Sequence, residues 1–300
     1  MPKLENAVHH WWPRALSKFW ANNDGVTHRI SSDGELLASQ PKSFGGIRND
    51  NNVRIGGGWD FSFESTFNKA DDAFATVIPW LYTLSCSTPA KDARFEERLS
   101  KVEVTDDQQA ILAECLASLI ARSPNLRQRV RLTAAYYQRD FGLRDPTDER
   151  LVGLNSQHAQ ESIASAMARR GKFVVLWAGD REFIFGDGFL HNISMPNNPP
   201  LSPRCLIPLT PGLAVFYSKP LQYRSYPQAF SLNLTRDEVD FVNNTVQIYS
   251  KRYLFFRDIY PVLTSEFTCN EHREFEYHKH PWIDALEQTM ATRYFGSRRQ

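Results

Sequence analysis

The 300-residue sequence lacks most of the features that assign a protein to a broad class at once. Its four cysteines, Cys86, Cys115, Cys205 and Cys269, are far apart and form no Cys-x-x-Cys pair, so we expect free thiols in a reducing compartment. No apolar run approaches the roughly 18 residues of a membrane span. The N-terminus also lacks the apolar segment of a signal peptide. We therefore expect a cytoplasmic protein without a membrane partner.

Charge and catalytic motifs exclude further classes. The net charge is only +1, so no overall electrostatic field points to nucleic acid. The run Gly56 to Gly58 is not followed by the Lys-Ser or Lys-Thr of a phosphate-binding loop. Gly-x-Ser-x-Gly and His-Glu-x-x-His are also absent, so the sequence does not support a serine hydrolase or a zinc protease of those types.

Hydrophobic periodicity predicts helices in the first half of the chain. Thr105 or Asp106 is a suitable N-cap for the second helix, and Ser123 followed by Pro124 is a strong start for the third. Asp33-Gly34 predicts the turn of a hairpin, and the Gly- and Asn-rich stretch 43–60 predicts a loop able to approach a ligand. The expected helices cover 61–84, 105–121, 123–130 and about 155–170, and the hairpin covers 26–39.

The second half predicts strands. Two are expected to join at Gly179-Asp180, two more are punctuated by Pro and Gly, and a further strand follows a helix with a Thr235–Glu238 capping box. This order indicates an α+β fold, with a helical N-terminal half and a small hairpin followed by a mainly antiparallel sheet and a C-terminal helix. The expected strands cover 172–179, 181–187, 205–210, 212–218 and 251–258, the helix covers 235–250, and 190–202 is a surface loop.

We expect residues 1–300 to form a single domain. Its helix-rich part covers about 1–170, its strand-rich part about 171–260 and a histidine-rich C-terminal extension about 261–300.

Two carboxylates fall on the apolar face of the first expected helix. At about 100° per residue, Phe67 and Phe74 share one face. Glu64 and Asp71 lie in the same sector, whereas Asp72 points to the side. Acids in an apolar stripe are costly unless they pair with a cation, a metal or each other. Roughly 10 Å apart along the axis, they suit one wall of a pocket; alternatively, both lie at the wet edge of a narrow stripe.

Arginines are concentrated after the second expected helix. Arg122 lies at the edge of its apolar face and can reach Glu64, Asp71 or a phosphate, unless it only favours the helix dipole. Arg127 and Arg131 share a face of the third helix, in a stretch without acids that forms either a nucleic-acid contact or a solvated face.

Two later segments carry further candidates. Asp187 ends an expected strand between two glycines, which leaves it open to a ligand or makes it a turn residue without other role. The tail offers zinc donors, but their spacing matches no strong zinc pattern and favours a surface loop. These donors are Cys269, His272, His278 and His280.

Six motifs, in order from His9 to about Phe256, resemble a bacterial family known as domain of unknown function 4238. That family opens with His-His-aromatic-x-Pro and continues with two acids that have six or seven residues between them and an Arg-Ser/Thr-Pro. A late strand ending in Asp, a Pro-Leu-Ser/Thr-Pro strand and a closing helix with a central Asn complete the pattern. The matching stretches are HHWWPRALSKFW, FESTFNKADDAF, ARSPNLRQR, FIFGDGF, IPLTPG and EVDFVNNTVQIYSKRYLFF.

The resemblance implies that a set of ionisable residues comes together, although it supplies no activity. One histidine of the adjacent pair is expected to face the acids, with Trp11 and Trp12 anchoring the segment in the core; alternatively, the pair is structural. The positions concerned are His9, His10, Glu64, Asp71 or Asp72, Arg122 and Asp187.

These residues support two hypotheses. In the first, Glu64, Asp71 and Asp187 hold Mg²⁺ or Mn²⁺ in a phosphodiesterase or nuclease, such as a toxin or antiphage effector. His9 or His10 is then a ligand or general base, or an acid/base group without metal, and Arg122 stabilises phosphate charge. In the second, the cluster is a structural network or an anion pocket, or the chain binds nucleic acid without cleaving it. The sequence leaves the oligomeric state open.

Overall fold

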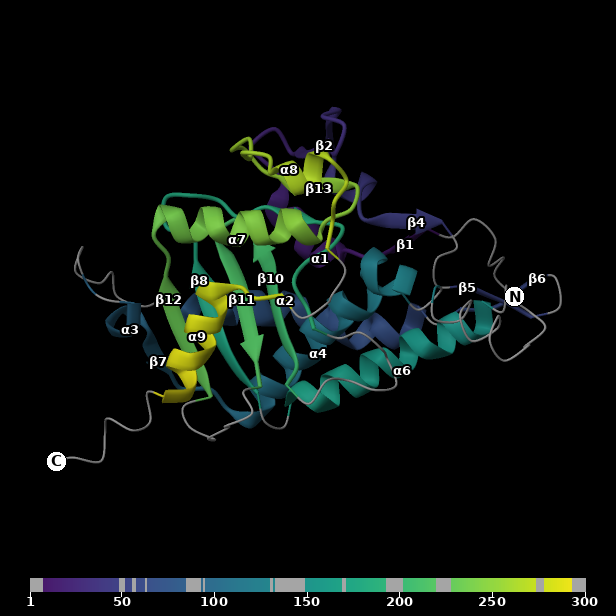
Figure 1. Cartoon of the computed structure of the whole chain (residues 1–300). Coiled ribbons are helices and arrows are strands. Elements are labelled where there is room, and N and C mark those ends of the chain that lie inside the picture. The colour runs from purple at the N-terminus through teal and green to yellow at the C-terminus, as the bar shows by residue number, and fades with distance from the viewer. Residues whose placement is uncertain are drawn as a thin grey trace.

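The computed structural model shows a mixed α+β protein (Figure 1). It describes residues 8–48, 52–55, 58–62, 64–84, 93, 95–129, 132, 149–168, 171–192, 202–219, 228–273 and 278–292.

Two larger sheets and two strand pairs make up the β structure. The five-stranded sheet has the order β10-β11-β8-β12-β7, and its neighbours are antiparallel except for the parallel pair β8 and β12. A four-stranded antiparallel sheet has the order β3-β2-β13-β9, and β1 pairs with β4 and β5 with β6. The strands are β1 Val8–His10, β2 Thr27–Ser31, β3 Leu36–Ser39, β4 Gly46–Arg48, β5 Asn52–Ile55, β6 Gly58–Ser62, β7 Ser100–Val102, β8 Lys172–Trp177, β9 Phe185–Gly186, β10 Arg204–Thr210, β11 Leu213–Ser218, β12 Ala229–Asn233 and β13 Tyr253–Phe256.

Helices surround the five-stranded sheet. In Figure 1, α9 crosses in front of the strands, α7 runs along their upper ends, and α6 extends away from them beside α4. The helices are α1 Arg14–Ser17, α2 Asn68–Thr83, α3 Phe95–Arg98, α4 Asp106–Arg122, α6 Glu149–Ala168, α7 Arg236–Tyr249, α8 Ser265–Thr268 and α9 Pro281–Thr292, with a further turn of helix over 124–129. Short 3₁₀ segments cover Lys18–Trp20, Pro41–Ser43 and Glu64–Phe67.

Side chains alternate across β8 and divide the helices between the two faces of the sheet. Trp177 packs against Tyr82 of α2, with ring centroids 5.7 Å apart. Lys172 points to the opposite face, where its Nζ donates to the main-chain carbonyl of Met290 in α9 at 3.3 Å. The strands between these helices are buried on both faces, and one apolar cluster extends from Trp11 to Met290.

Several local predictions are confirmed because they rest on short-range chemistry. Thr105 and Thr235 each close a capping box, and the Ser123 hydroxyl accepts the amide of Leu126 at 3.2 Å. Gly34 has a φ of +88° in the turn between β2 and β3, as the Asp-Gly pair predicts. Strands β10, β11 and β13 also form where expected.

Other predictions were wrong where non-local pairing decides the structure. The stretch 43–60 contains strands β4, β5 and part of β6, because its backbone pairs with β1 and with itself. Of the two strands expected to join at Gly179-Asp180, the first forms as β8, whereas the second is reduced to the two residues of β9, which belongs to a different sheet. The first long helix begins only at Asn68, and the fourth begins six residues early at Glu149.

The N-terminal half therefore contains more strand than expected, and β7 from this half joins the main sheet. The C-terminal extension packs on the rest of the protein through α9, whose Ile283, Leu286 and Met290 are buried in the core. Within the described ranges, the helices are too short or too polar to cross a membrane.

Candidate functional site

Aromatic packing holds the N-terminal strand β1 on the protein. Trp12 stacks on Phe185 with ring centroids 4.4 Å apart, and Trp11 lies 6.1 Å from Phe255. The amide of Trp11 donates to the carbonyl of Gly45 at 2.7 Å. Gly45 has a φ of +71°, and a Cβ there would lie 2.8 Å from the Cβ of Trp12, so this approach requires glycine. The two tryptophans are thus the anchor that the sequence predicts.

Asp71 and Arg122 form a bidentate ion pair between α2 and α4. Arg122 Nη2 lies 2.6 Å from Asp71 Oδ1, and Nη1 lies 3.1 Å from Oδ2. This side-on geometry is the strong form of an arginine–carboxylate contact. Asp72 is exposed on the other side of α2. Of the two acids that the sequence left open, Asp71 is the one that faces Arg122.

The guanidinium of Arg122 is fully occupied. Its side chain is 2% exposed and lies over the ring of Phe67, 4.7 Å from the centroid. Nε donates to the carbonyl of Ser118, Nη1 donates to the carbonyl of His10, and Nη2 donates to the Ser118 hydroxyl. With the two bonds to Asp71, all five N–H groups have acceptors. Arg122 therefore fastens β1, α2 and α4 together and has no donor left for a ligand in this arrangement.

Glu64 lies on the 3₁₀ turn before α2 and faces His9. Its Oε2 is 4.0 Å from His9 Nε2, and the two side chains are 39% and 7% exposed. Burial lowers the pKa of His9 most strongly; the charge of Glu64 opposes this shift, and the charge of Arg127 adds to it. The His9 imidazole is therefore mainly neutral near pH 7.

His10 has one occupied and one unoccupied ring nitrogen. The backbone of Lys42 hydrogen bonds to the ring, and Nε2 is buried with no partner in the described part of the chain. The Lys42 bond is therefore made by Nδ1, which leaves the Nε2 lone pair as the acceptor of the neutral tautomer. Burial is the main cause that lowers the pKa of His10, and the charges of Arg14 and Arg122 add to it, whereas the Lys42 bond and Glu64 raise it.

The described arginines of the basic stretch after α4 are buried, unlike those on a solvated helix face. Arg127 and Arg129 are 7% and 8% exposed, and the charge of Arg127 acts on His9. Arg129 acts instead on Tyr249, so the two arginines serve different regions. Arg131 lies outside the described residues.

Asp187 is buried rather than open to a ligand. Its carboxylate accepts the amides of Lys251 at 2.7 Å and Arg252 at 2.9 Å, on the turn that follows α7. Burial raises the pKa of Asp187, and these amide bonds oppose the shift. A Cβ on Gly188 would lie 2.0 Å from the carbonyl oxygen of Tyr249, so that glycine permits close packing rather than ligand access. Both carboxylate oxygens of Asp187 are thus accounted for by a turn.

The carboxylates expected to hold a divalent metal already have other partners. Asp71 is paired with Arg122, and Asp187 with backbone amides. Among the residues that the structure describes, no three His, Cys, Asp or Glu side chains are grouped to hold a metal ion. In this arrangement Asp71 and Asp187 each have another partner, and the binding of Mg²⁺ or Mn²⁺ by Glu64, Asp71 and Asp187 stays a prediction.

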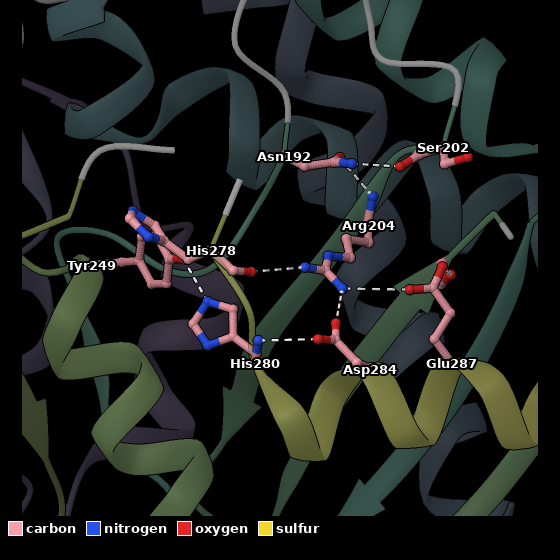
Figure 2. A network of polar contacts seen from close by, with 9 residues as sticks. Asn192, Ser202, Arg204, Tyr249, His278, His280, Asp284 and Glu287 are labelled. Carbon is pink, nitrogen blue, oxygen red and sulfur yellow. Dashed lines mark hydrogen bonds and ion pairs between the residues drawn. The ribbon is translucent and has the colours of Figure 1, made fainter. Parts of the chain in front are cut away.

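The histidine-rich tail contributes to a separate polar network, shown in Figure 2. His280 Nε2 lies 2.8 Å from the hydroxyl of Tyr249, and Arg204 binds Asp284 at 2.6 Å. Burial, followed by the charge of Arg204, lowers the pKa of His280 to about 4, and burial raises the pKa of Tyr249 to about 12. Glu287 joins the network through Arg204 and Ser218. This network fastens α9 to the ends of β10 and β11.

Two partners in the N-terminal cluster were missed at the sequence level. Ser118 precedes Arg122 by four residues and shares its helix face, so helical spacing offered a signal for it. The Lys42 contact gave no such signal, because a main-chain group makes it and any residue provides one.

Comparison of the chain with protein-family models, with curated proteins and with solved structures gave no match.

Proposed function

We propose that this protein cleaves phosphodiester bonds in nucleic acid, with His10 as the general base. The observation that carries the proposal is the His10 ring, which is oriented through Nδ1 while its buried Nε2 has no partner among the described residues. A neutral imidazole held in this way can accept a proton from an attacking hydroxyl or water when substrate binding opens access to Nε2.

Neighbouring groups complete the proposed chemistry. His9 and His10 lie on opposite sides of β1, and the charge of Glu64 acts on both rings. Arg14 and Arg127 add positive charge beside the histidines, which favours an anionic substrate. A bound phosphate would raise the pKa of His9 by its negative charge, so that His9 can supply a proton to the leaving oxygen. Arg122 positions His10 through its main-chain carbonyl rather than contacting phosphate.

The cellular setting is part of the proposal. The six ordered motifs support membership in the domain of unknown function 4238 family. Cys115, Cys205 and Cys269 are free thiols, which supports a reducing cytoplasm. A nuclease in that compartment suits a toxin or antiphage effector.

A cleavage assay with matched histidine variants tests this function. Wild type, His10→Gln and His28→Gln are incubated with labelled RNA and DNA in EDTA, Mg²⁺ or Mn²⁺. His28 is the control because its Nδ1 also bonds a main-chain carbonyl, that of Arg257, at 2.7 Å. We expect wild-type cleavage in EDTA, at least 100-fold slower cleavage by His10→Gln, and an unchanged rate for His28→Gln. Cleavage that requires Mg²⁺ or Mn²⁺ would instead favour the metal-dependent hypothesis.

The saturated guanidinium of Arg122 favours a second candidate, a non-catalytic module whose cluster fixes the fold. In that case, His10→Gln binds nucleic acid as wild type does, no preparation cleaves it, and the cluster variants change only stability. Affinity that falls steeply with salt would identify nucleic-acid binding through phosphate contacts.

A further inference from the structure

A cavity of about 260 Å³ lies beside α7, apart from the N-terminal cluster. Arg181, Asp240 and Asn244 supply polar groups to its lining, and Ile259, Tyr260 and Val262 supply apolar ones. This volume is near the lower end for small-ligand pockets, so the cavity suits a compact molecule.

Two amides of α7, one helical turn apart, hold the cavity walls in place. Asn243 Oδ1 accepts the amide of Ile184 at 3.0 Å, and its Nδ2 donates to the carbonyl of Glu182 at 3.0 Å. Gln247 makes the equivalent pair of bonds to the opposite wall, donating to the Val262 carbonyl at 2.9 Å and accepting the Thr264 amide at 2.8 Å. The cavity is therefore preformed.

The apolar wall of the cavity is unusually exposed. Ile259, Tyr260 and Val262 are 41%, 53% and 87% exposed within four consecutive positions. Contiguous exposed apolar side chains mark binding sites more often than isolated ones do. The ring of Tyr260 is fixed edge-on against Phe256, with centroids 5.6 Å apart, and so offers a defined surface.

The two charged side chains at the rim of the cavity interact only weakly with each other. Arg181 Nη2 lies 3.5 Å from Asp240 Oδ2, at the limit for a hydrogen bond, and the side chains are 38% and 49% exposed. The Nε of Arg181 is buried and has no partner in the part of the chain described. A buried guanidinium N–H without an acceptor indicates a missing water or ligand atom. Glu182, in contrast, is already bound by Arg257 at 2.9 Å.

We propose that this cavity binds a free α-amino acid with an apolar side chain. Its carboxylate would meet Arg181, its ammonium would meet Asp240, and its side chain would lie against Tyr260 and Val262. A zwitterion matches the rim better than a simple anion does, because Asp240 would repel an anion beside Arg181.

Calorimetric titration with L-phenylalanine and L-leucine tests the proposal on the full chain. We expect saturable binding of at least one of them below about 10 mM. L-phenylalaninamide lacks the carboxylate and N-acetyl-L-phenylalanine lacks the ammonium, so both should bind at least tenfold more weakly than L-phenylalanine.

Variants locate the site. Arg181→Met and Asp240→Asn should each weaken binding at least tenfold, whereas Arg252→Met should leave it unchanged. Arg252 is a suitable control because it is an exposed arginine that does not line the cavity. Unfolding curves establish that each variant is folded. No saturable binding, equal binding of the blocked analogues, or unchanged binding by folded Arg181→Met would overturn the proposal.

Discussion

Removing the charge of Asp71 leaves the Arg122 guanidinium buried without a counter-ion. The Arg122 side chain is 2% exposed and that of Asp71 is 34% exposed, so the two partners differ in their access to water. An uncompensated buried charge costs about 3–5 kcal/mol, and Asp71→Asn should lower the free energy of unfolding by that amount. Arg122→Met should cost less, about 1–3 kcal/mol, because the remaining Asp71 carboxylate can be hydrated and methionine can fill the apolar space over Phe67.

Urea unfolding followed by tryptophan fluorescence measures these differences. The double variant Asp71→Asn/Arg122→Met should resemble Arg122→Met alone, giving a coupling free energy about equal to the whole effect of Asp71→Asn, roughly 3–5 kcal/mol. Asp72→Asn is the matched control, one residue along α2 and exposed, and should change stability by less than about 0.5 kcal/mol. If Asp71→Asn is as mild as Asp72→Asn, or if the single effects simply add, the buried-pair explanation is refuted.

Three further predictions concern the rest of the fold. The pKa of His280 is about 4 in the folded protein, against 6.5 for an ordinary histidine, so the unfolded chain takes up a proton first as the pH falls. The free energy of unfolding should therefore decrease as the pH is lowered from 6.5 to 4, by up to roughly 3 kcal/mol. Urea unfolding at each pH should show that His280→Asn abolishes this dependence. The pKa of Lys172 is about 8 in the folded protein, against 10.5 for an ordinary lysine, so this residue keeps its proton to higher pH in the unfolded chain. The contribution of Lys172 to wild-type stability should therefore rise as the pH increases from 8 to 10.5. Lys172→Met should remove that rise and stabilise the protein at pH 7; an unchanged slope would contradict the assignment. Thr235→Ala removes a capping box and should cost about 1 kcal/mol, measured as a lower urea midpoint with an unchanged slope.

Local chemistry could be predicted from the sequence, whereas contacts between distant segments could not. The capping boxes at Thr105 and Thr235 depend on residues three positions apart, so the sequence alone contains both partners. Strand β9 follows β8 closely in the chain but pairs with β13, about 70 residues later. No short-range pattern distinguishes that pairing from a hairpin.

The candidate site shows the same division. The pairing of Asp71 with Arg122 agrees with the helical positions of both residues, because each lies on a face directed at the other helix. Glu64 was placed on the same helix in the sequence, but it lies on a 3₁₀ turn whose geometry differs from 100° per residue. The surroundings of Asp187 could not be predicted, since its partners are main-chain amides 64 and 65 residues away.

The measurement that tests the central claim most directly is the pH dependence of kcat/KM for phosphodiester cleavage in EDTA. Because burial and neighbouring cations lower the pKa of His10 from 6.5, an acidic limb should appear below pH 6.5, as the free enzyme's base takes up a proton, and a separate basic limb should follow the loss of the proton from His9. This acidic limb should be absent from the residual activity of His10→Gln and present in His28→Gln. A His10→Gln enzyme with the wild-type rate and the same acidic limb would contradict the assignment of His10 as the general base.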